Sequence, residues 1–127
     1  MNKPKILVVD NELDICNFIK SFFEIRGFDV TYALNGDEAL LKASTEPALV
    51  LLDVKMRYDG EGIEYLPRIR KALPKAKILM ITGVDDQETI RMAKDLGADD
   101  YITKPLMLEY LETTVLEKVK SLGVAAA

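Results

Sequence analysis

Apolar and polar residues follow one another along the chain in blocks that predict strands and helices in alternation. Short apolar runs rich in β-branched residues and bounded by charged ones are typical of strands buried in a sheet. The segments that we predict to be strands are residues 5–10, 29–33, 48–54, 76–83 and 100–103. The second of these alternates polar with apolar residues, which is typical of a strand near the edge of a sheet.

The segments between these strands carry apolar residues at the spacing of one helix face. The predicted apolar stripes are Ile15, Phe18, Ile19 and Phe22; Ala39, Leu40 and Ala43; Ile90, Ala93 and Leu96; and Leu108, Leu111, Val115, Val119 and Leu122. A further helix is predicted around residues 63–73, and its Pro67 must fall in the first turns or kink the helix.

Strand and helix therefore alternate five times. Near-continuous apolar strands are buried on both faces, which predicts a parallel sheet with helices on each side. Because crossovers are right-handed, few topologies remain, and we predict an α/β fold with a doubly wound five-stranded parallel sheet of flavodoxin-like order 2-1-3-4-5. Residues 1–123 are expected to form this one domain, and residues 124–127 a disordered tail or an artificial chain end.

Composition narrows the classes of partner. The 127 residues suit a single domain, 49% of them are hydrophobic, and no apolar run approaches the roughly 18 residues that span a bilayer. A signal-peptide pattern is absent, and the single cysteine, Cys16, is expected to be a small core residue, so we expect a cytoplasmic protein without membrane contact. A net charge of −4 argues against binding nucleic acid through this segment. With no histidine in the chain, a histidine–metal site and a histidine base are both excluded.

Polar side chains lie at or just after the carboxyl ends of four of the predicted strands. They are Asp10, Asn11 and Glu12; Asp53; Thr82; and Thr103 and Lys104. In doubly wound sheets ligands bind beyond the carboxyl ends of the strands, at the switch point between the first and third. These side chains are therefore expected to converge on one rim of the sheet.

The chemistry of this rim points to phosphoryl transfer. Carboxylates that lie close together repel each other, and a hard divalent cation with oxygen ligands relieves that repulsion. Lys104 adds a point charge suited to a carboxylate or a phosphate oxygen. Asp53 interrupts the most continuous apolar run, where an unpaired carboxylate is costly, so a functional role is favoured over a structural one. An aspartate with a metal and a lysine beside it, and no general base, suits a nucleophile that forms an acyl phosphate.

The motifs ILVVDNE, LVLLDVKM, ITG and GADDYITKP resemble, in order and spacing, the successive motifs of response-regulator receiver domains. The resemblance covers residues 5–122 and implies a phosphoacceptor domain of two-component signalling. It implies a signalling switch that assists its own phosphorylation and dephosphorylation, not an enzyme. It also implies a histidine kinase or phosphotransfer protein as phosphodonor, an output domain or protein as target, and an option to form homodimers on activation.

The resemblance assigns a role to each matching residue of the rim. Asp53 resembles the phosphoacceptor, and Lys104 the lysine that pairs with it or with its phosphate. Asp10, Asn11, Asp53 and the backbone carbonyl of Lys55 match the positions that bind Mg²⁺, for which Mn²⁺ is an alternative.

The switch is implied in the same way. Thr82 resembles the hydroxyl residue that bonds a phosphoryl oxygen, and Tyr101 the aromatic that then turns inward. The 104–105 peptide bond is expected to be cis by the same resemblance. The face formed by the fourth helix, fifth strand and fifth helix would change shape, and Met92, Met107 and Tyr110 are expected on or near it.

The chain departs from the family pattern in two places. Asn11 stands where the family usually has the acid that binds Mg²⁺ directly, so weaker metal affinity is expected unless Glu12 compensates. After Asp53 the loop reads MRYDGEG, where the family usually has a proline after the methionine and one residue fewer before the glycine. The geometry of residues 57–62 and the start of the third helix therefore stay open.

Three other functions are consistent with parts of the sequence. One is a degenerate receiver that acts only as a phosphorylation-independent interaction module. Another is a phosphatase of the haloacid dehalogenase type, which position 12 disfavours because Glu12 replaces the second aspartate of a D-x-D motif, and which leaves Asp53 unexplained. The last is a flavodoxin-like cofactor binder, disfavoured because no Ser/Thr/Gly-rich phosphate loop follows the first strand.

Overall fold

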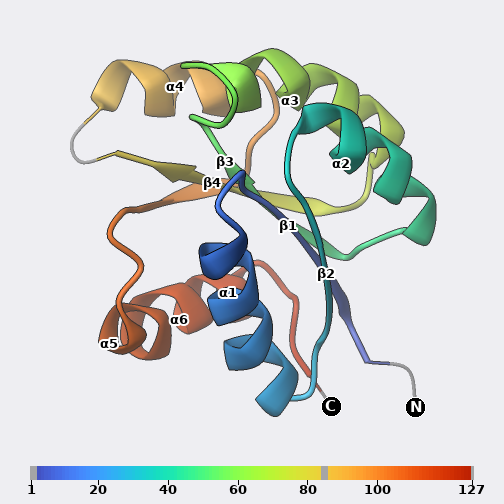
Figure 1. The fold of residues 1–127 in the computed structure, drawn as a ribbon, viewed down its shortest axis with the longest axis vertical. Helices are drawn as coiled ribbons and strands as arrows, with labels where there is room; N and C mark the ends of the chain where they lie inside the picture. Colours follow the sequence, from blue (N-terminus) through green and yellow to red (C-terminus); the bar gives the residue numbers. More distant parts are fainter. Residues whose placement is uncertain (1–2, 84–85, 127) are drawn as a thin grey trace.

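The computed structural model describes residues 3–83 and 86–126, which form a three-layered α/β domain (Figure 1). Its sheet contains strands β1 (Lys5–Val9), β2 (Asp29–Ala33), β3 (Leu49–Asp53), β4 (Lys77–Thr82) and β5 (Asp100–Thr103). All neighbouring strands are parallel, in the order β2-β1-β3-β4-β5. The predicted fold class and strand order are confirmed.

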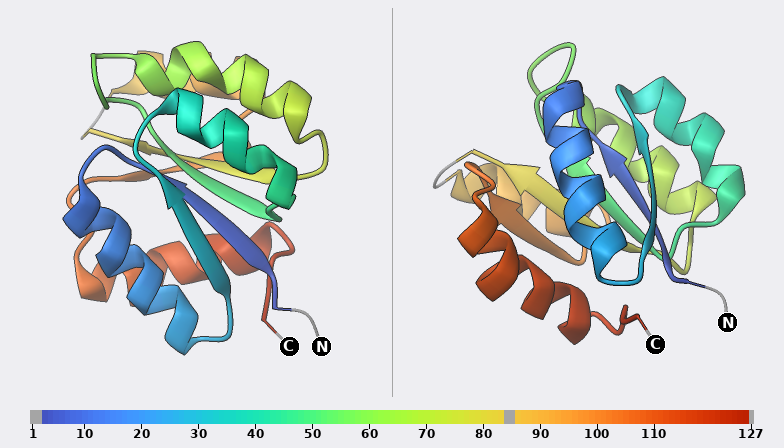
Figure 2. Two further views of the ribbon diagram at one scale, coloured as in Figure 1. Left: turned by 45° about the vertical axis from the view of Figure 1, so that its right-hand side comes forward. Right: turned by 60° about the horizontal axis from the view of Figure 1, so that its bottom comes forward.

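Helices cover both faces of the sheet (Figure 2). One face carries α1 (Leu13–Ile25), α5 (Leu108–Tyr110), a π-helical turn (Leu111–Val115) and α6 (Leu116–Ser121), the last three forming one continuous helical segment. The other face carries α2 (Gly36–Lys42), a 3₁₀ turn (Ala43–Thr45), α3 (Glu61–Ala72) and α4 (Gln87–Asp95). Within residues 3–83 and 86–126, no helix has both the length and the apolar character to cross a membrane.

Two hydrophobic cores form because successive side chains of a strand point to opposite faces. Ile6 and Val8 of β1 pack into the core beneath α1 and α6, whereas Leu7 and Val9 pack into the core beneath α2 and α3. Every residue of β3 is buried, as the continuous apolar run predicts for a central strand. Asp53, the last residue of this strand, is therefore enclosed by buried side chains.

The helix faces differ in part from the predicted stripes. In α1 the buried residues are Cys16, Ile19, Phe22 and Phe23, whereas Phe18 is 38% exposed. The stripe is turned by about one residue because the small Cys16 lies against the sheet in place of Phe18. Leu108, expected on the buried face of the last helix, is 53% exposed.

The end of the chain, expected to be a disordered tail over residues 124–127, is described as far as Ala126. Val124 is 6% exposed and belongs to the core beneath α1 and α6. Gly123, with a φ of 86°, turns the backbone so that the Val124 N–H donates to the Val119 carbonyl at 3.2 Å. This turn brings an apolar side chain back onto the sheet. Ala127 lies outside the described residues.

Candidate functional site

Three buried polar side chains lie at the carboxyl ends of β1, β3 and β4. Asp10 is fully buried, and Asp53 and Thr82 are 2% and 3% exposed. The parallel register places these strand ends on one edge of the sheet, and the Lys104 N–H joins them by donating to the Thr82 carbonyl at 2.9 Å. The convergence expected from the strand order is therefore present.

Lys104 links the two buried carboxylates. Its Nζ lies 2.9 Å from Oδ2 of Asp53 and 3.8 Å from Oδ2 of Asp10. Burial disfavours the ammonium, but the hydrogen bond and charge of Asp53, with the charge of Asp10, outweigh it and raise the pKa of Lys104. The peptide bond from Lys104 to Pro105 is cis, as expected.

The Asp53 carboxylate is unusually basic. Burial, together with the neighbouring charge of Asp10, raises its pKa to about 7 despite the ammonium of Lys104. Its Oδ2 accepts the Lys104 hydrogen bond, and its Oδ1 accepts the backbone N–H of Lys55 at 3.3 Å. Asp53 thus has one short, charge-assisted partner and one long contact.

Asp10 has an unsatisfied oxygen. Its Oδ1 accepts the backbone N–H of Glu12 at 2.9 Å, whereas its buried Oδ2 has no hydrogen-bond donor within the part of the chain that the structure describes. A buried carboxylate oxygen without a donor is costly, and a cation beside it removes that cost. Asp10 and Asp53 therefore fit a divalent cation, although the described residues contain no group of three or more His, Cys, Asp or Glu side chains placed to hold one. Backbone, amide or water oxygens must complete its coordination.

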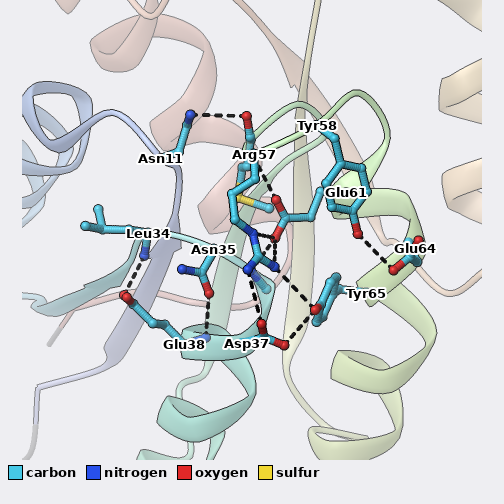
Figure 3. Close-up of polar contacts among 12 residues, drawn as sticks. Asn11, Leu34, Asn35, Asp37, Glu38, Arg57, Tyr58, Glu61, Glu64 and Tyr65 are labelled. Carbon is cyan, nitrogen blue, oxygen red and sulfur yellow. Dashed lines mark hydrogen bonds and ion pairs between the residues drawn. The ribbon is translucent and has the colours of Figure 1, made fainter.

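Asn11 points across to the loop after β3. Its Nδ2 donates to the Met56 carbonyl at 3.1 Å (Figure 3). Glu12 is exposed and is the N-cap residue of α1, but its side chain forms no capping hydrogen bond. Asn11 and Glu12 are the two residues that could replace the missing acidic metal ligand. Only the Asn11 side chain is hydrogen-bonded to the segment that follows Asp53.

The loop over residues 57–62 is built around Glu61, a residue without a predicted role. Glu61 is fully buried, and its carboxylate accepts N–H groups of Gly36 (2.8 Å) and Arg57 (backbone 2.8 Å, Nε 3.0 Å, Nη2 2.7 Å; Figure 3). Burial works against the charged carboxylate, but Arg57 and the Gly36 N–H outweigh it and lower the pKa of Glu61. Opposite charges four residues apart were the one signal for this pair.

The same cluster joins α2 to α3. Arg57 Nη1 lies 3.2 Å from Oδ2 of Asp37, and the Tyr65 hydroxyl donates to Oδ1 of Asp37 at 2.6 Å. The third helix begins at Glu61, two residues earlier than expected. Its second residue, Gly62, lies close against β3, since a Cβ there would lie 2.0 Å from the Asp53 carbonyl oxygen. The loop is thus held from both sides.

Tyr101 of β5 lies between two helices. Its ring centroid is 4.5 Å from the ammonium of Lys118 on α6 and 5.7 Å from that of Lys94 on α4. Lys118 also donates to the Tyr101 carbonyl. Of the residues expected nearby, Met92 and Met107 are 46% and 62% exposed.

A cavity of about 540 Å³ opens beside Asp53, Lys55, Thr82 and Lys104. A larger one, of about 900 Å³, lies at the opposite end of the sheet around Ala48, Pro74 and Gly123. The smaller cavity is the candidate site. Among the described residues, buried carboxylates and a lysine ammonium lie together only at the edge of the sheet where this cavity opens.

Comparisons with known proteins agree with this geometry. The sequence profile of the response regulator receiver domain family matches residues 6–116. The alkaline phosphatase synthesis transcriptional regulatory protein PhoP of Bacillus subtilis is 40% identical over 127 residues, covering 99% of this chain and 52% of the relative. A CpxR homolog of Haemophilus influenzae is 39% identical over 101 residues, covering 80% of this chain and 44% of that protein. The chain thus spans about half the length of these relatives.

Solved structures show the same fold. A CheY-like receiver domain protein from Methanospirillum hungatei superposes with a TM-score of 0.83 at 32% identity, covering 96% of this chain and 98% of that one. A response regulator from Burkholderia pseudomallei, with a phosphorylated aspartic acid, a calcium ion and citrate, gives a TM-score of 0.78 at 28% identity, covering 94% of this chain and 72% of that one.

Proposed function

Because this chain belongs to the response regulator receiver domain family, we propose that it is switched by a phosphoryl group on Asp53, received from a histidine kinase or a phosphotransfer protein. The observation that carries the proposal is the buried Asp53 carboxylate at the edge of an open cavity, 2.9 Å from Lys104. Placing a charge there is costly, so the arrangement is difficult to explain as a structural feature alone.

The transfer needs a nucleophile and neutralised charge. A carboxylate oxygen of Asp53 attacks the phosphorus of the donor, an O–P bond forms, and the P–N bond of the phosphohistidine breaks with its electron pair leaving on the imidazole. The Lys104 ammonium, already at hydrogen-bond distance from Asp53, would pair with the transferred oxygens. The 127 residues contain no histidine, so a phosphohistidine donor must lie outside this segment.

The residues proposed to hold Mg²⁺, or Mn²⁺ in its place, are Asp10, Asn11, Asp53 and the Lys55 carbonyl. The unsatisfied Oδ2 of Asp10 supports this set, because it needs a positive partner besides the ammonium 3.8 Å away. When bound, the cation would neutralise the negative charge that gathers on the transferred phosphoryl group.

The proposed switch uses Thr82 and Tyr101. Phosphorylation adds acceptor oxygens beside the Thr82 hydroxyl, and the ring of Tyr101 would turn inward as that hydroxyl is drawn to them. Its contacts with Lys94 and Lys118 would then change, and with them the surface of α4, β5 and α6. We propose that a downstream output domain or protein reads this surface in the cytoplasm and that two copies can pair through it.

The other functions receive less support. A phosphatase with its nucleophile after β1 would use Asp10, which does not line the cavity beside Asp53, and would leave the Asp53–Lys104 contact unexplained. A degenerate interaction module would not require the contact between Lys104 and Asp53. A flavodoxin-like cofactor binder would need a phosphate loop after β1, where Leu13 instead begins α1.

The test is the intact mass of the protein after incubation with acetyl phosphate, with and without Mg²⁺. Wild type should gain one phosphoryl group in the presence of Mg²⁺, and Asp53→Asn none. Asp59→Asn, an exposed aspartate of the loop after β3, is the matched control and should be phosphorylated like wild type. Absence of an adduct in wild type under Mg²⁺ and Mn²⁺ would favour the interaction module.

A further inference from the structure

The two departures from the family pattern touch each other in the structure. Asn11 replaces an acid after β1, and residues 56–62 form an unusual loop after β3. They meet where Asn11 Nδ2 donates to the Met56 carbonyl at 3.1 Å. A carboxylate at position 11 could not make this contact, because it would place an acceptor oxygen against another acceptor.

A single peptide group links Asn11 to Glu61. The Met56 carbonyl and the Arg57 N–H belong to the same planar peptide unit. While the carbonyl accepts from Asn11, the N–H of Arg57 donates to Glu61 Oε1 at 2.8 Å. The peptide is thus held at both ends, and turning it would break both hydrogen bonds.

Glu61 is well suited to hold this peptide. It is fully buried, and besides the Arg57 backbone it receives the Arg57 guanidinium and the Gly36 N–H at the start of α2. Charge-assisted hydrogen bonds from a guanidinium fork constrain direction as well as distance. The Glu61 carboxylate therefore fixes the orientation of the loop relative to α2 and to the first turn of α3.

We propose that Glu61 is a positioning residue for the divalent-cation site, acting through the Met56–Arg57 peptide on Asn11. The peptide carbonyl engages the nitrogen of the Asn11 amide and so leaves its oxygen as the atom available to a cation or its water. In this way the loop compensates for the missing acid at position 11. The inference rests on the proposed function, since it assumes that the cation binds beside Asp10 and Asp53.

The first test is Mg²⁺ affinity, measured by NMR titration of the backbone and Asn11 side-chain amides with Mg²⁺ alone. Glu61→Gln should weaken the affinity by roughly tenfold or more, because an amide at position 61 turns a donor towards N–H groups. Glu64→Gln is the matched control: Glu64 lies one turn further along α3, is exposed, and accepts from the Tyr58 hydroxyl at 2.8 Å. It should leave the affinity unchanged.

A double-mutant cycle separates positioning from general loosening of the loop. In an Asn11→Asp background the side chain no longer donates to Met56, so Glu61→Gln should cost at least about threefold less in Mg²⁺ affinity than it does with Asn11 in place. Equal losses in the two backgrounds would overturn the proposal, as would an unchanged affinity in Glu61→Gln alone.

Arg57→Lys serves if Glu61→Gln does not fold. It keeps a cation near Glu61 but loses the guanidinium fork, so it should weaken Mg²⁺ binding with Asn11 present and less so with Asp at position 11. An unchanged affinity with Asn11 present contradicts the proposal. Because these titrations measure binding without a phosphodonor, their outcome is independent of whether wild type forms the adduct that tests the proposed function.

Discussion

The Nζ atom of Lys104 lies 2.9 Å from Oδ2 of Asp53, although the two residues are 51 positions apart in the chain. The contact is possible because β3 and β5 flank β4 in one parallel sheet, so that both residues emerge at the same edge. The ammonium of Lys104 compensates the charge of Asp53. Oδ2 of Asp10 has no hydrogen-bond donor among the described residues, and a second cation beside it would compensate its charge.

Asp53 is expected to destabilise the metal-free protein at neutral pH. Burial raises its pKa to about 7 from the ordinary aspartate value of 3.8, which we take for the unfolded chain. The folded state therefore binds the proton more tightly, and its stability falls as pH rises from about 4 to 7. Asp53→Asn removes this loss and should raise the free energy of unfolding by roughly 1–3 kcal/mol at pH 7.5.

Urea unfolding in EDTA at pH 5 and pH 7.5 checks this prediction. The advantage of Asp53→Asn over wild type should be larger at pH 7.5 than at pH 5. An advantage that does not grow with pH would show that Asp53 is ionised in the folded protein at both values.

Lys104 should be needed for fast phosphorylation. Lys104→Met removes the ammonium from Asp53 and should slow adduct formation with acetyl phosphate by at least about tenfold at saturating Mg²⁺. Lys75→Met, on an exposed lysine before β4, is the control and should react at the wild-type rate. The measurement is the initial rate of the phosphoryl adduct by mass spectrometry, and equal rates for the two variants would contradict the role given to Lys104.

Much of this site could be predicted from the sequence, because it depends on strand order. Once apolar runs and helices alternate, the ends of β1, β3, β4 and β5 must share one edge, which brings Asp10, Asp53 and Lys104 together. Glu61 could not be predicted in the same way. Its buried carboxylate accepts the N–H of Gly36, which is 25 residues away in the chain. From the sequence alone, a glutamate in a polar segment is expected to be exposed to solvent.

Helix faces were predicted less well for a related reason. The spacing of apolar residues in α1 is compatible with either Phe18 or Cys16 against the sheet, and only packing against the strands decides between them. The tail shows the same limit, since three alanines after Val124 gave no indication that the valine returns to the core.

Cys16 is predicted to be unreactive in the folded protein. Burial, reinforced by the charge of Asp10, raises the pKa of its thiol to about 12, so almost no thiolate exists at pH 8. A thiol reagent such as dithionitrobenzoate should react only as fast as the protein unfolds, and immediately in urea. Rapid reaction under native conditions would mean that α1 opens far more often than its packing implies.

Val124 should contribute to stability. Val124→Ala removes buried apolar volume and should lower the free energy of unfolding by about 1 kcal/mol. Leu41→Ala removes a side chain that is 78% exposed and should change it by less than about 0.5 kcal/mol. Urea unfolding of both variants measures the difference, and equal effects would place Val124 in a tail that does not pack.

The most direct test of the central claim is to locate the phosphoryl group. Wild-type protein is phosphorylated with acetyl phosphate and Mg²⁺ and then reduced with borohydride, which converts an aspartyl phosphate to homoserine. Peptide mass spectrometry should find homoserine at position 53 and at no other aspartate. Homoserine at position 10, or no conversion in protein that carries the adduct, would contradict the assignment of Asp53 as the phosphoacceptor.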